Sequence, residues 1–347
     1  MIQIMRAVCC LAIVLFHSRY LAESELWGSM PLRFGYLAVE FFFITSGYLM
    51  AAKACRKEES GLPLNVDTRQ YICHKFGRIY PYVAFAFAVA TINICIVRQY
   101  DPVSGVFKAL FEPLLLGASG LSTGYYNGPI WYLSALLLGS LILYPLCRRW
   151  KRTFTDLVAP VAALLLAGYL YRQCGNLCQD LYPYGLLRGL TGMCFGCAGY
   201  AVCQQLSQKE PGRGAKLLLT AVELIGYAVV LFGMQWNRPE HWDYQFLLIL
   251  AVCIAISFSG KSYTAGIPAG GKWFGWVGKI CLPVYLCHEF WAWHLKTYLP
   301  NQSVPARLAV YFAVVAATTA ACLITVDGLK KLYEKRRKKQ MPREAGA

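Results

Sequence analysis

The sequence contains few charged residues, and acidic residues are scarcer than basic ones. Only 15% of its 347 residues are charged, and 18 aspartates and glutamates stand against 34 lysines and arginines. Apolar residues make up 57% of the chain, and the mean hydropathy is +0.42. A soluble globular domain carries about 25% charged residues. This composition excludes an ordinary soluble protein and indicates a chain that lies in a membrane.

Sequence signals of several other protein classes are also missing. No series of segments of about ten residues with alternating polarity, typical of a membrane β-barrel, is present. No cleavage site of small residues follows the first apolar run, so we interpret this run as a retained span and not as a signal peptide. We find neither a polar segment that could form a soluble domain nor a repeat typical of inverted-repeat transporters. The sequence therefore predicts an all-α polytopic membrane protein.

The cysteines are numerous, but they lack the spacing of a metal site. Most of the 15 lie within apolar runs, where a thiol serves as a small polarizable packing group. Cys174 and Cys178 lie in a predicted external loop, without a second pair that would complete a zinc site. These two could form a disulfide, although we expect reduced thiols. The sequence thus predicts no bound metal.

Long apolar runs predict about ten transmembrane helices with both termini in the cytoplasm. Their predicted bounds are 4–21, 35–52, 78–97, 129–147, 154–171, 184–203, 217–234, 244–259, 275–298 and 305–327. Basic residues cluster in the loops on the side that both termini share, which is the pattern of cytoplasmic loops in a plasma-membrane protein. The segment 104–120 is too short and too polar for a span, and we interpret it as an external re-entrant or interfacial helix.

The net charge of +16 does not indicate nucleic-acid binding, because the basic residues lie at the ends of the predicted spans. We expect no nucleic-acid partner. We divide the chain into a transmembrane domain, residues 1–329, and a basic cytoplasmic tail, residues 330–347. The tail could bind anionic lipid headgroups, but a solvated end is the more common interpretation of such a segment.

Arg6 and His17 stand out in the first apolar run because no other charged residue lies between them. They are eleven positions apart, a spacing that returns to within about 20° of one helix face and advances about 16 Å. If Arg6 lies at the headgroups, His17 lies near the middle of the bilayer. An ionisable residue at that depth is costly and is a candidate functional residue. The alternative is an imidazole that ends a short span or makes an interhelical hydrogen bond.

Glu40 lies in the second apolar run, directly before three phenylalanines. A carboxylate at that depth needs a cation or a donor as partner. It could orient His17 from the neighbouring helix and raise its basicity. The alternative is that Glu40 is a structural partner for an arginine elsewhere in the bundle. Ser46 and Gly47, which follow on the same run, are expected to let two helices approach closely.

Lys75 and Arg78 lie at the predicted cytoplasmic entrance of the third span. They are three residues apart and therefore share a helix face. Cations at such an entrance suit phosphate groups, and arginine suits bidentate phosphate contact. The alternative is the ordinary excess of basic residues at cytoplasmic helix ends.

Motifs in five predicted spans together resemble those of the acyltransferase-3 family of integral membrane acyltransferases. The motifs, in chain order, are Arg6-x10-His17, Val39-Glu40-Phe41-Phe42-Phe43-Ile44-Thr45-Ser46-Gly47-Tyr48, Lys75-Phe76-Gly77-Arg78-Ile79-Tyr80-Pro81, Ile130-Trp131-Tyr132-Leu133-Ser134 and Leu282-Pro283-Val284-Tyr285-Leu286-Cys287-His288. The resemblance extends to about residue 327. The sequence departs from the family where Lys75 replaces the usual arginine, where Ala38 replaces a common glycine, and where Ala135 replaces the glutamate of many polysaccharide O-acetyltransferases.

The resemblance implies transfer of an acyl group, usually acetyl from cytoplasmic acetyl-CoA, to a hydroxyl of a glycan or cell-envelope precursor. By this resemblance His17 is the catalytic histidine, Arg6 is its partner, and Arg78 with Lys75 contacts the coenzyme phosphates. A histidine is chemically suited to this reaction, since it can act as the base that activates a hydroxyl or can itself be acylated. Acetyl-CoA would be a donor substrate, and the reaction needs no metal.

Four further residues are candidates for substrate binding. Asn127, Trp131 and Tyr285 could donate hydrogen bonds to the anionic oxygen of a tetrahedral intermediate. His288 is predicted to lie in the outer half of its span, beside tryptophans of an aromatic belt, so we favour a structural or acceptor-binding role over a catalytic one.

A rival interpretation is a transporter or sensor of a small solute or a lipid-linked precursor, because buried arginine, histidine and glutamate residues also form proton relays. The two interpretations differ in their use of coenzyme A. An acyltransferase binds coenzyme A and consumes a thioester, whereas a transporter moves solute without consuming one.

Overall fold

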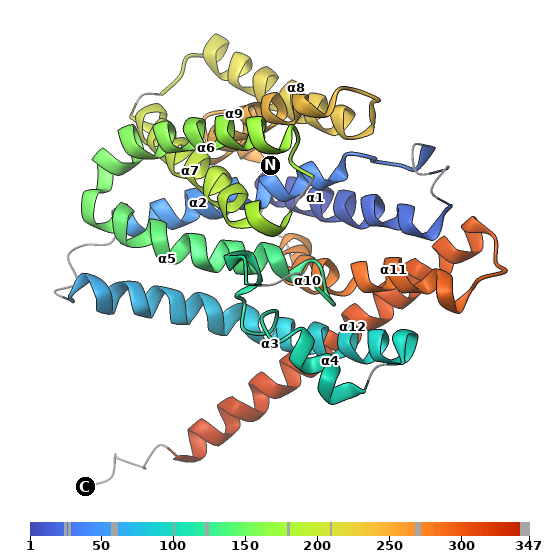
Figure 1. The fold of residues 1–347 in the computed structure, drawn as a ribbon. Coiled ribbons are helices and arrows are strands. Elements are labelled where there is room, and N and C mark those ends of the chain that lie inside the picture. The colour runs from blue at the N-terminus through green and yellow to red at the C-terminus, as the bar shows by residue number, and fades with distance from the viewer. Residues whose placement is uncertain are drawn as a thin grey trace, which may run out of the picture.

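The computed structural model is a single bundle of long helices (Figure 1). It describes residues 1–23, 26, 29–56, 62–99, 101–121, 125–178, 181–208, 210–267 and 272–340. The α-helices are α1 (Ile2–His17), α2 (Ala38–Arg56), α3 (Leu64–Arg98), α4 (Pro102–Lys108), α5 (Ile130–Thr153), α6 (Ala159–Cys174), α7 (Leu181–Ser207), α8 (Arg213–Gln235), α9 (Asp243–Ser259), α10 (Lys272–Cys287), α11 (Glu289–Tyr298) and α12 (Val304–Gln340). Short helical turns join some of them, namely η1 (Ser18–Leu21), η3 (Gly35–Leu37), η4 (Gly117–Ser119), η5 (Phe154–Val158), η6 (Glu240–Trp242) and η7 (Tyr263–Gly266).

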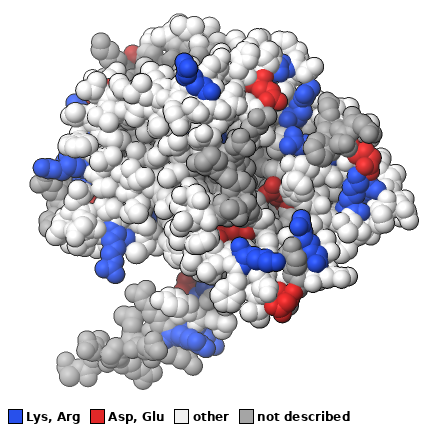
Figure 2. All heavy atoms as spheres, viewed as in Figure 1, with Lys and Arg blue, Asp and Glu red and all other residues white. Residues whose placement is uncertain are grey.

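Among the described residues, eight helical segments are long and apolar enough to cross a membrane, which confirms a polytopic membrane protein. One of them, Ile130–Cys174, contains both α5 and α6 and so covers two predicted spans. The predicted span 275–298 is divided between α10 and α11, and its apolar part, Gly275–Cys287, is short. Figure 2 shows that uncharged residues form most of the visible surface, as expected of a chain surrounded by lipid. The count of ten spans and the side on which the termini lie stay predictions.

Two helices are longer than the apolar runs that predict them. α3 has 35 residues and begins at Leu64, well before the predicted span start at residue 78. A helix of that length is about 52 Å long, whereas the hydrocarbon layer is about 30 Å thick. α12 continues to Gln340, so the predicted tail is helical as far as that residue, and residues 341–347 lie outside the described residues. The extension of α12 contacts α3 where Lys330 Nζ donates to the hydroxyl of Tyr82, 3.2 Å away.

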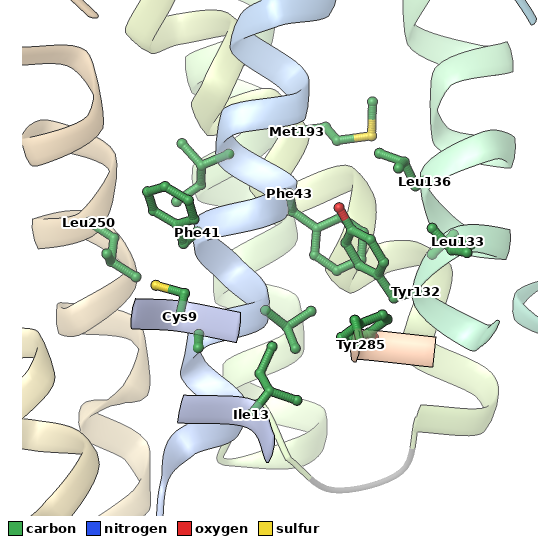
Figure 3. Packing of buried hydrophobic residues seen from close by; sticks show 14 of the residues in the cluster. Cys9, Ile13, Phe41, Phe43, Tyr132, Leu133, Leu136, Met193, Leu250 and Tyr285 are labelled. Atoms are coloured by element: carbon green, nitrogen blue, oxygen red, sulfur yellow. The ribbon is translucent and has the colours of Figure 1, made fainter. Parts of the chain in front are cut away.

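The centre of the bundle is the contact between α2 and α7, which glycines make close. A Cβ atom on Gly47 of α2 would lie 2.1 Å from the carbonyl oxygen of Met193 on α7, and one on Gly196 would lie 2.0 Å from that of Ile44. The expected close approach at Gly47 is therefore observed. Figure 3 shows large side chains packed around this contact, with Phe41 and Phe43 of α2 facing different neighbours. Phe43 contacts the Tyr132 ring at a centroid distance of 4.6 Å.

The segment between α3 and α5 lies outside the segments that can span a membrane. Its short helix α4 begins at a cap in which Asp101 accepts from the backbone N–H of Ser104 at 2.9 Å. The turns that follow are packed against the bundle, with Glu112 and Leu115 fully buried. The predicted external helix 104–120 is thus a short helix followed by turns, and these turns cover one end of the bundle.

The two ends of the bundle differ chemically. At one end, here named the basic end, Arg148 pairs with Asp67 at 3.2 Å and donates to the carbonyl oxygen of Ala54 at 3.3 Å. At the other, the aromatic end, the rings of Tyr20 and Trp293 stack at a centroid distance of 4.1 Å. Basic residues favour the cytoplasmic side and aromatic residues favour membrane interfaces. The predicted orientation, in which the basic end faces the cytoplasm, stays a prediction.

Candidate active site

His17 is the last residue of α1, and its ring lies at the centre of a cluster from three helices. Its Nδ1 atom lies 3.0 Å from the carbonyl oxygen of Ile13 and 3.0 Å from Nε2 of His288. Its Nε2 atom lies 3.5 Å from Oε1 of Glu289. His288 lies in the break between α10 and α11, and Glu289 is the first residue of α11. The break therefore brings two further ionisable side chains to His17.

The hydrogen bonds of the cluster assign a proton to each imidazole. Nδ1 of His288 lies 2.7 Å from the carbonyl oxygen of Tyr285. A carbonyl only accepts, so His288 Nδ1 donates, and His288 Nε2 is left as an acceptor. His17 Nδ1 must then be the donor in its contact with His288. His17 Nε2 consequently carries a lone pair, which is the form of imidazole that can act as a base.

A cavity of about 410 Å³, here named the histidine cavity, opens beside this cluster. The side chain of His17 is 17% exposed and that of Glu289 is 15% exposed, so both can be reached by a small molecule. Nine of its 21 lining residues are aromatic. The aromatic residues that line it are Phe16, Tyr20, Tyr36, Tyr125, Tyr126, Trp131, Tyr285, Phe290 and Trp293.

A second cavity of about 660 Å³, here named the basic cavity, lies toward the basic end. Its wall contains the cationic residues Lys53, Lys75, Arg78, Lys279 and Lys330, as well as His74. Among its described lining residues Asp327 is the one acid. Lys75 donates to the Ser140 hydroxyl at 2.7 Å, which fixes its ammonium group in the wall. The structure thus places Lys75 and Arg78 in one cavity whose net charge suits an anion.

The two cavities approach each other along α10. Leu282 lines the basic cavity and Tyr285 lines the histidine cavity, so the two are about 4.5 Å apart along the helix axis. No described residue lines both cavities. The Tyr285 ring contacts the Tyr132 ring at a centroid distance of 5.6 Å. A thin aromatic partition therefore separates the cavities.

Arg6 lies on the side of the basic cavity rather than beside His17. A Cβ atom built on Gly278, which lines that cavity, would lie 3.7 Å from Nη1 of Arg6. The backbone oxygen of Arg6 also faces the Cys281 thiol of α10, at 4.0 Å. Arg6 therefore neighbours a residue of the basic cavity, whereas His17 lines the histidine cavity.

Glu40 is paired with Arg188, which was the alternative that the sequence left open. Arg188 of α7 donates from Nε to Oε1 of Glu40 at 2.6 Å and from Nη2 to the carbonyl oxygen of Tyr36 at 3.1 Å. Both side chains are buried, yet Arg188 lines the histidine cavity and lies 5.1 Å from the Trp131 ring centroid. The carboxylate beside His17 is that of Glu289 and not that of Glu40. The expected contact between Glu40 and His17 is therefore wrong.

The four predicted substrate-binding residues gather around the histidine cavity in different ways. Trp131 and Tyr285 line it. His288 is fully buried behind His17. Asn127 is also fully buried, and its Nδ2 donates to the carbonyl oxygen of Leu286 at 3.0 Å, so it ties the turn before α5 to the end of α10.

The sequence predicts no role for Glu289, Arg188 or Gly128. A Cβ atom on Gly128 would lie 2.1 Å from Oε2 of Glu289, so a larger residue at this position would have to displace the carboxylate. Glu289 directly follows His288, and Arg188 is a lone charge in an apolar run. These positions mark Glu289 and Arg188 as candidate functional residues in the sequence. They do not reveal which side chain contacts each of them in the folded protein.

Glu112 holds the turn that carries Asn127 and Gly128. Its carboxyl group accepts from the backbone N–H groups of Tyr126 and Asn127, the latter at 3.0 Å. Burial outweighs these bonds and raises the pKa of Glu112 to about 8 from its ordinary value of 4.5. The folded chain therefore holds a proton that the unfolded chain loses above pH 4.5.

The sign of this linkage predicts how stability depends on pH. The stability gained from protonated Glu112 is fully present below pH 4.5 and is lost as pH rises through about 8. The variant Glu112→Gln stays neutral at every pH. Its unfolding temperature, measured relative to that of the native chain, should therefore rise between about pH 5 and about pH 9. Thermal unfolding in detergent measures this. Glu210→Gln is the control, because Lys261 lowers the pKa of this exposed acid below 4.5. An equal rise in both variants would contradict the prediction.

No group of three or more histidine, cysteine, aspartate or glutamate side chains that could hold a metal ion occurs within the described ranges. No disulfide bond joins any two cysteines in the part of the chain that the structure describes, Cys174 and Cys178 included.

Comparison with known proteins gives one match. A family model described as an acyltransferase domain matches residues 2–327. No curated protein and no solved structure matches the chain. The matched range contains every residue that lines the histidine cavity and all but the last residue, Lys330, of those that line the basic cavity.

Proposed function

The chain belongs to the acyltransferase-3 family. On this premise we propose that it transfers an acyl group from cytoplasmic acyl-CoA to a hydroxyl of a glycan or cell-envelope precursor. Acetyl-CoA is the proposed donor, and the plasma membrane is the proposed location. One observation carries the proposal: a cationic cavity and a histidine cavity approach each other along α10, separated by one aromatic partition. This arrangement suits a donor and an acceptor that arrive from opposite sides.

The basic cavity supports binding of the donor. Coenzyme A carries several phosphate charges, and the wall offers five lysine and arginine side chains against one aspartate. Arg78 can make bidentate contact with a phosphate, while Lys75 acts as a point charge. With its phosphates held there, the thioester end of the coenzyme would extend along α10 toward Tyr285.

The histidine cluster supports activation of the acceptor. Nε2 of His17 would take the proton of the acceptor hydroxyl as its oxygen attacks the thioester carbonyl carbon. The imidazolium that forms would be stabilised by Glu289, whose Oε1 lies 3.5 Å from Nε2. Collapse of the tetrahedral intermediate breaks the carbon–sulfur bond, and His17 returns the proton to the departing coenzyme thiolate. The products are an ester and free coenzyme A.

Arg188 is the best placed donor for the anionic oxygen of that intermediate. Its bonds to Glu40 and to the carbonyl of Tyr36 use Nε and Nη2, so Nη1 remains for a ligand in the cavity that it lines. A donor that is already fixed by an ion pair needs no reorganisation during the reaction. Tyr285 and Trp131 line the same cavity and could add a second donor.

Substitution of Arg78 tests the assignment of the donor site. Arg78→Gln should weaken coenzyme A binding by about tenfold or more, because one charge-assisted phosphate contact is lost. Equilibrium binding of coenzyme A to the purified protein in nanodiscs measures the change.

Arg69→Gln is the matched control, since Arg69 is an exposed arginine of the same helix that does not line the cavity. Undiminished coenzyme affinity in Arg78→Gln would refute the donor assignment. A solute transporter would instead move its substrate across a vesicle membrane without consumption of any thioester, and that result would refute acyl transfer itself.

A further inference from the structure

We propose that a groove between α3, α11 and α12 binds a membrane lipid that carries a hydroxyl or amide N–H group just below its head. The apolar chain of the lipid lies in the groove, and Asn93 accepts a hydrogen bond from that group. This ligand is distinct from the donor and acceptor of the proposed reaction, so the lipid site stands independently of acyl transfer.

The groove has a volume of about 430 Å³, and apolar side chains from the three helices line it. Among them are Ile92 and Ile96 of α3, Leu295 of α11 and Val310 of α12. α3 and α12 both belong to segments that are long and apolar enough to cross a membrane. Ile92 and Ile96 are 61% and 62% exposed, so the groove opens onto a surface that lipid covers in the bilayer.

Asn93 differs from the rest of this wall. The residue is only 4% exposed, and its Oδ1 accepts no hydrogen bond from any residue that the structure describes. The indole N–H of Trp291, another polar group of the wall, already donates to the Thr318 hydroxyl at 3.0 Å. A buried amide oxygen without a donor is costly, most of all where lipid rather than water surrounds the protein. Asn93 is therefore the acceptor that a ligand of the groove can use.

A water molecule is a poor partner for Asn93 in this setting. A buried water needs two to four polar neighbours, whereas the lining residues of α3 around Asn93 are Val89, Ile92 and Ile96. The Asn93 amide can turn about its terminal torsion, which has a broad energy minimum, to meet a donor in the groove. The donor thus comes from a molecule whose remaining surface is apolar.

The position of Asn93 along α3 indicates the level of that donor in the membrane. Asn93 lies five residues before Arg98, the last residue of α3, which is about 7.5 Å along the helix axis. The predicted span ends at residue 97, so Asn93 lies just inside the apolar layer. Lipids with a sphingoid base or an amide-linked 3-hydroxyacyl chain carry hydroxyl and amide N–H groups at this level. The ester oxygens of a plain diacyl lipid only accept hydrogen bonds, so that class does not fit.

Photo-crosslinking with two matched lipids tests the proposal. The probes are an N-acyl sphingoid base with a diazirine in its acyl chain, and the same molecule with its hydroxyl groups and amide nitrogen methylated. The native chain is placed in phosphatidylcholine nanodiscs that contain a trace of either probe. Peptide mass analysis should locate the adduct on the lining segments 89–96 and 291–299. The unmethylated probe should label them about fivefold more strongly, which is the effect of one hydrogen bond.

Two variants locate the effect. Asn93→Leu should abolish the preference but keep labelling by the methylated probe, and Ile92→Trp should fill the groove and reduce labelling by both. Thr91→Val is the control for the first, because Thr91 Oγ1 is also buried without a hydrogen bond to a described residue but Thr91 does not line the groove. Ile324→Trp is the control for the second, since Ile324 of α12 is 74% exposed and does not line the groove.

Three results would overturn the proposal. They are equal labelling of the groove by the two probes in the native chain, a preference that persists in Asn93→Leu, and labelling spread evenly over all exposed helix faces, as for ordinary surrounding lipid. The comparison of the two probes on the native chain requires no variant, so it decides the proposal even if a substitution impairs folding.

Discussion

Replacement of His17 by alanine should reduce acyl transfer by about a thousandfold and leave coenzyme A binding unchanged. His17 is the residue of the cluster whose free nitrogen faces the histidine cavity, since its Nδ1 is committed to His288 and Ile13. His288 cannot replace it, because His288 is fully buried and its Nδ1 donates to a backbone carbonyl. Release of coenzyme A, measured with labelled acetyl-CoA and acceptor, gives the rate.

Further measurements check that the His17→Ala variant is folded and determine the chemical role of the His17 imidazole. His241→Ala removes an exposed histidine that does not line the cavity and should keep native activity. Retention of coenzyme affinity by His17→Ala shows that the basic cavity is intact. If His17→Ala kept a tenth or more of native turnover, His17 would be excluded as the base. Intact-mass analysis after exposure to acetyl-CoA alone distinguishes an acylated histidine from a base.

Substitution of Arg188 should have the largest effect on stability. Arg188→Met leaves the carboxylate of Glu40 buried without its cation, which costs about 3–5 kcal/mol of unfolding free energy. Removing both charges, in Glu40→Leu with Arg188→Met, should recover most of this loss, since no unpaired charge remains. Thermal and denaturant unfolding of the single and double variants in the same detergent measure the coupling.

The double variant also separates structure from catalysis. Lys296→Met is the contrasting case, because Lys296 pairs with Glu23 at an exposed site and its loss should change stability little. If Arg188 stabilises the reacting oxygen, the double variant should be stable and still slow. A single Arg188→Met variant as stable as the native chain would refute the buried pair, and full activity in the double variant would refute the catalytic role.

The sequence predicted the helices better than the contacts between them. Apolar runs follow from what lipid requires of each segment separately, so the predicted spans overlap helices in the structure. The partner of Glu40 could not be predicted in this way, because Arg188 lies 148 residues further along the chain and meets it only through the packing of α2 against α7. Glycine positions such as Gly47 indicated close approach but did not indicate which helix approaches.

The histidine cluster shows the same limit at the level of one helix. The run 275–298 predicts a continuous span, in which His288 lies in the outer half. The structure breaks this run into α10 and α11 at His288, and the break directs both His288 and Glu289 at His17. Pro283 lies within α10, five residues before the break, so the proline does not mark it. The local sequence therefore identified the ionisable residues but not their geometry.

The aromatic partition between the two cavities has a consequence for the cell. Because Tyr132 and Tyr285 separate the cavities and no described residue lines both, the two cavities do not join into one channel within the part of the bundle that the structure describes. The acyl group could be transferred to the acceptor at this partition while the coenzyme remains in the basic cavity. Chemistry across the membrane would then proceed without dissipating the proton and ion gradients on which an energised membrane depends.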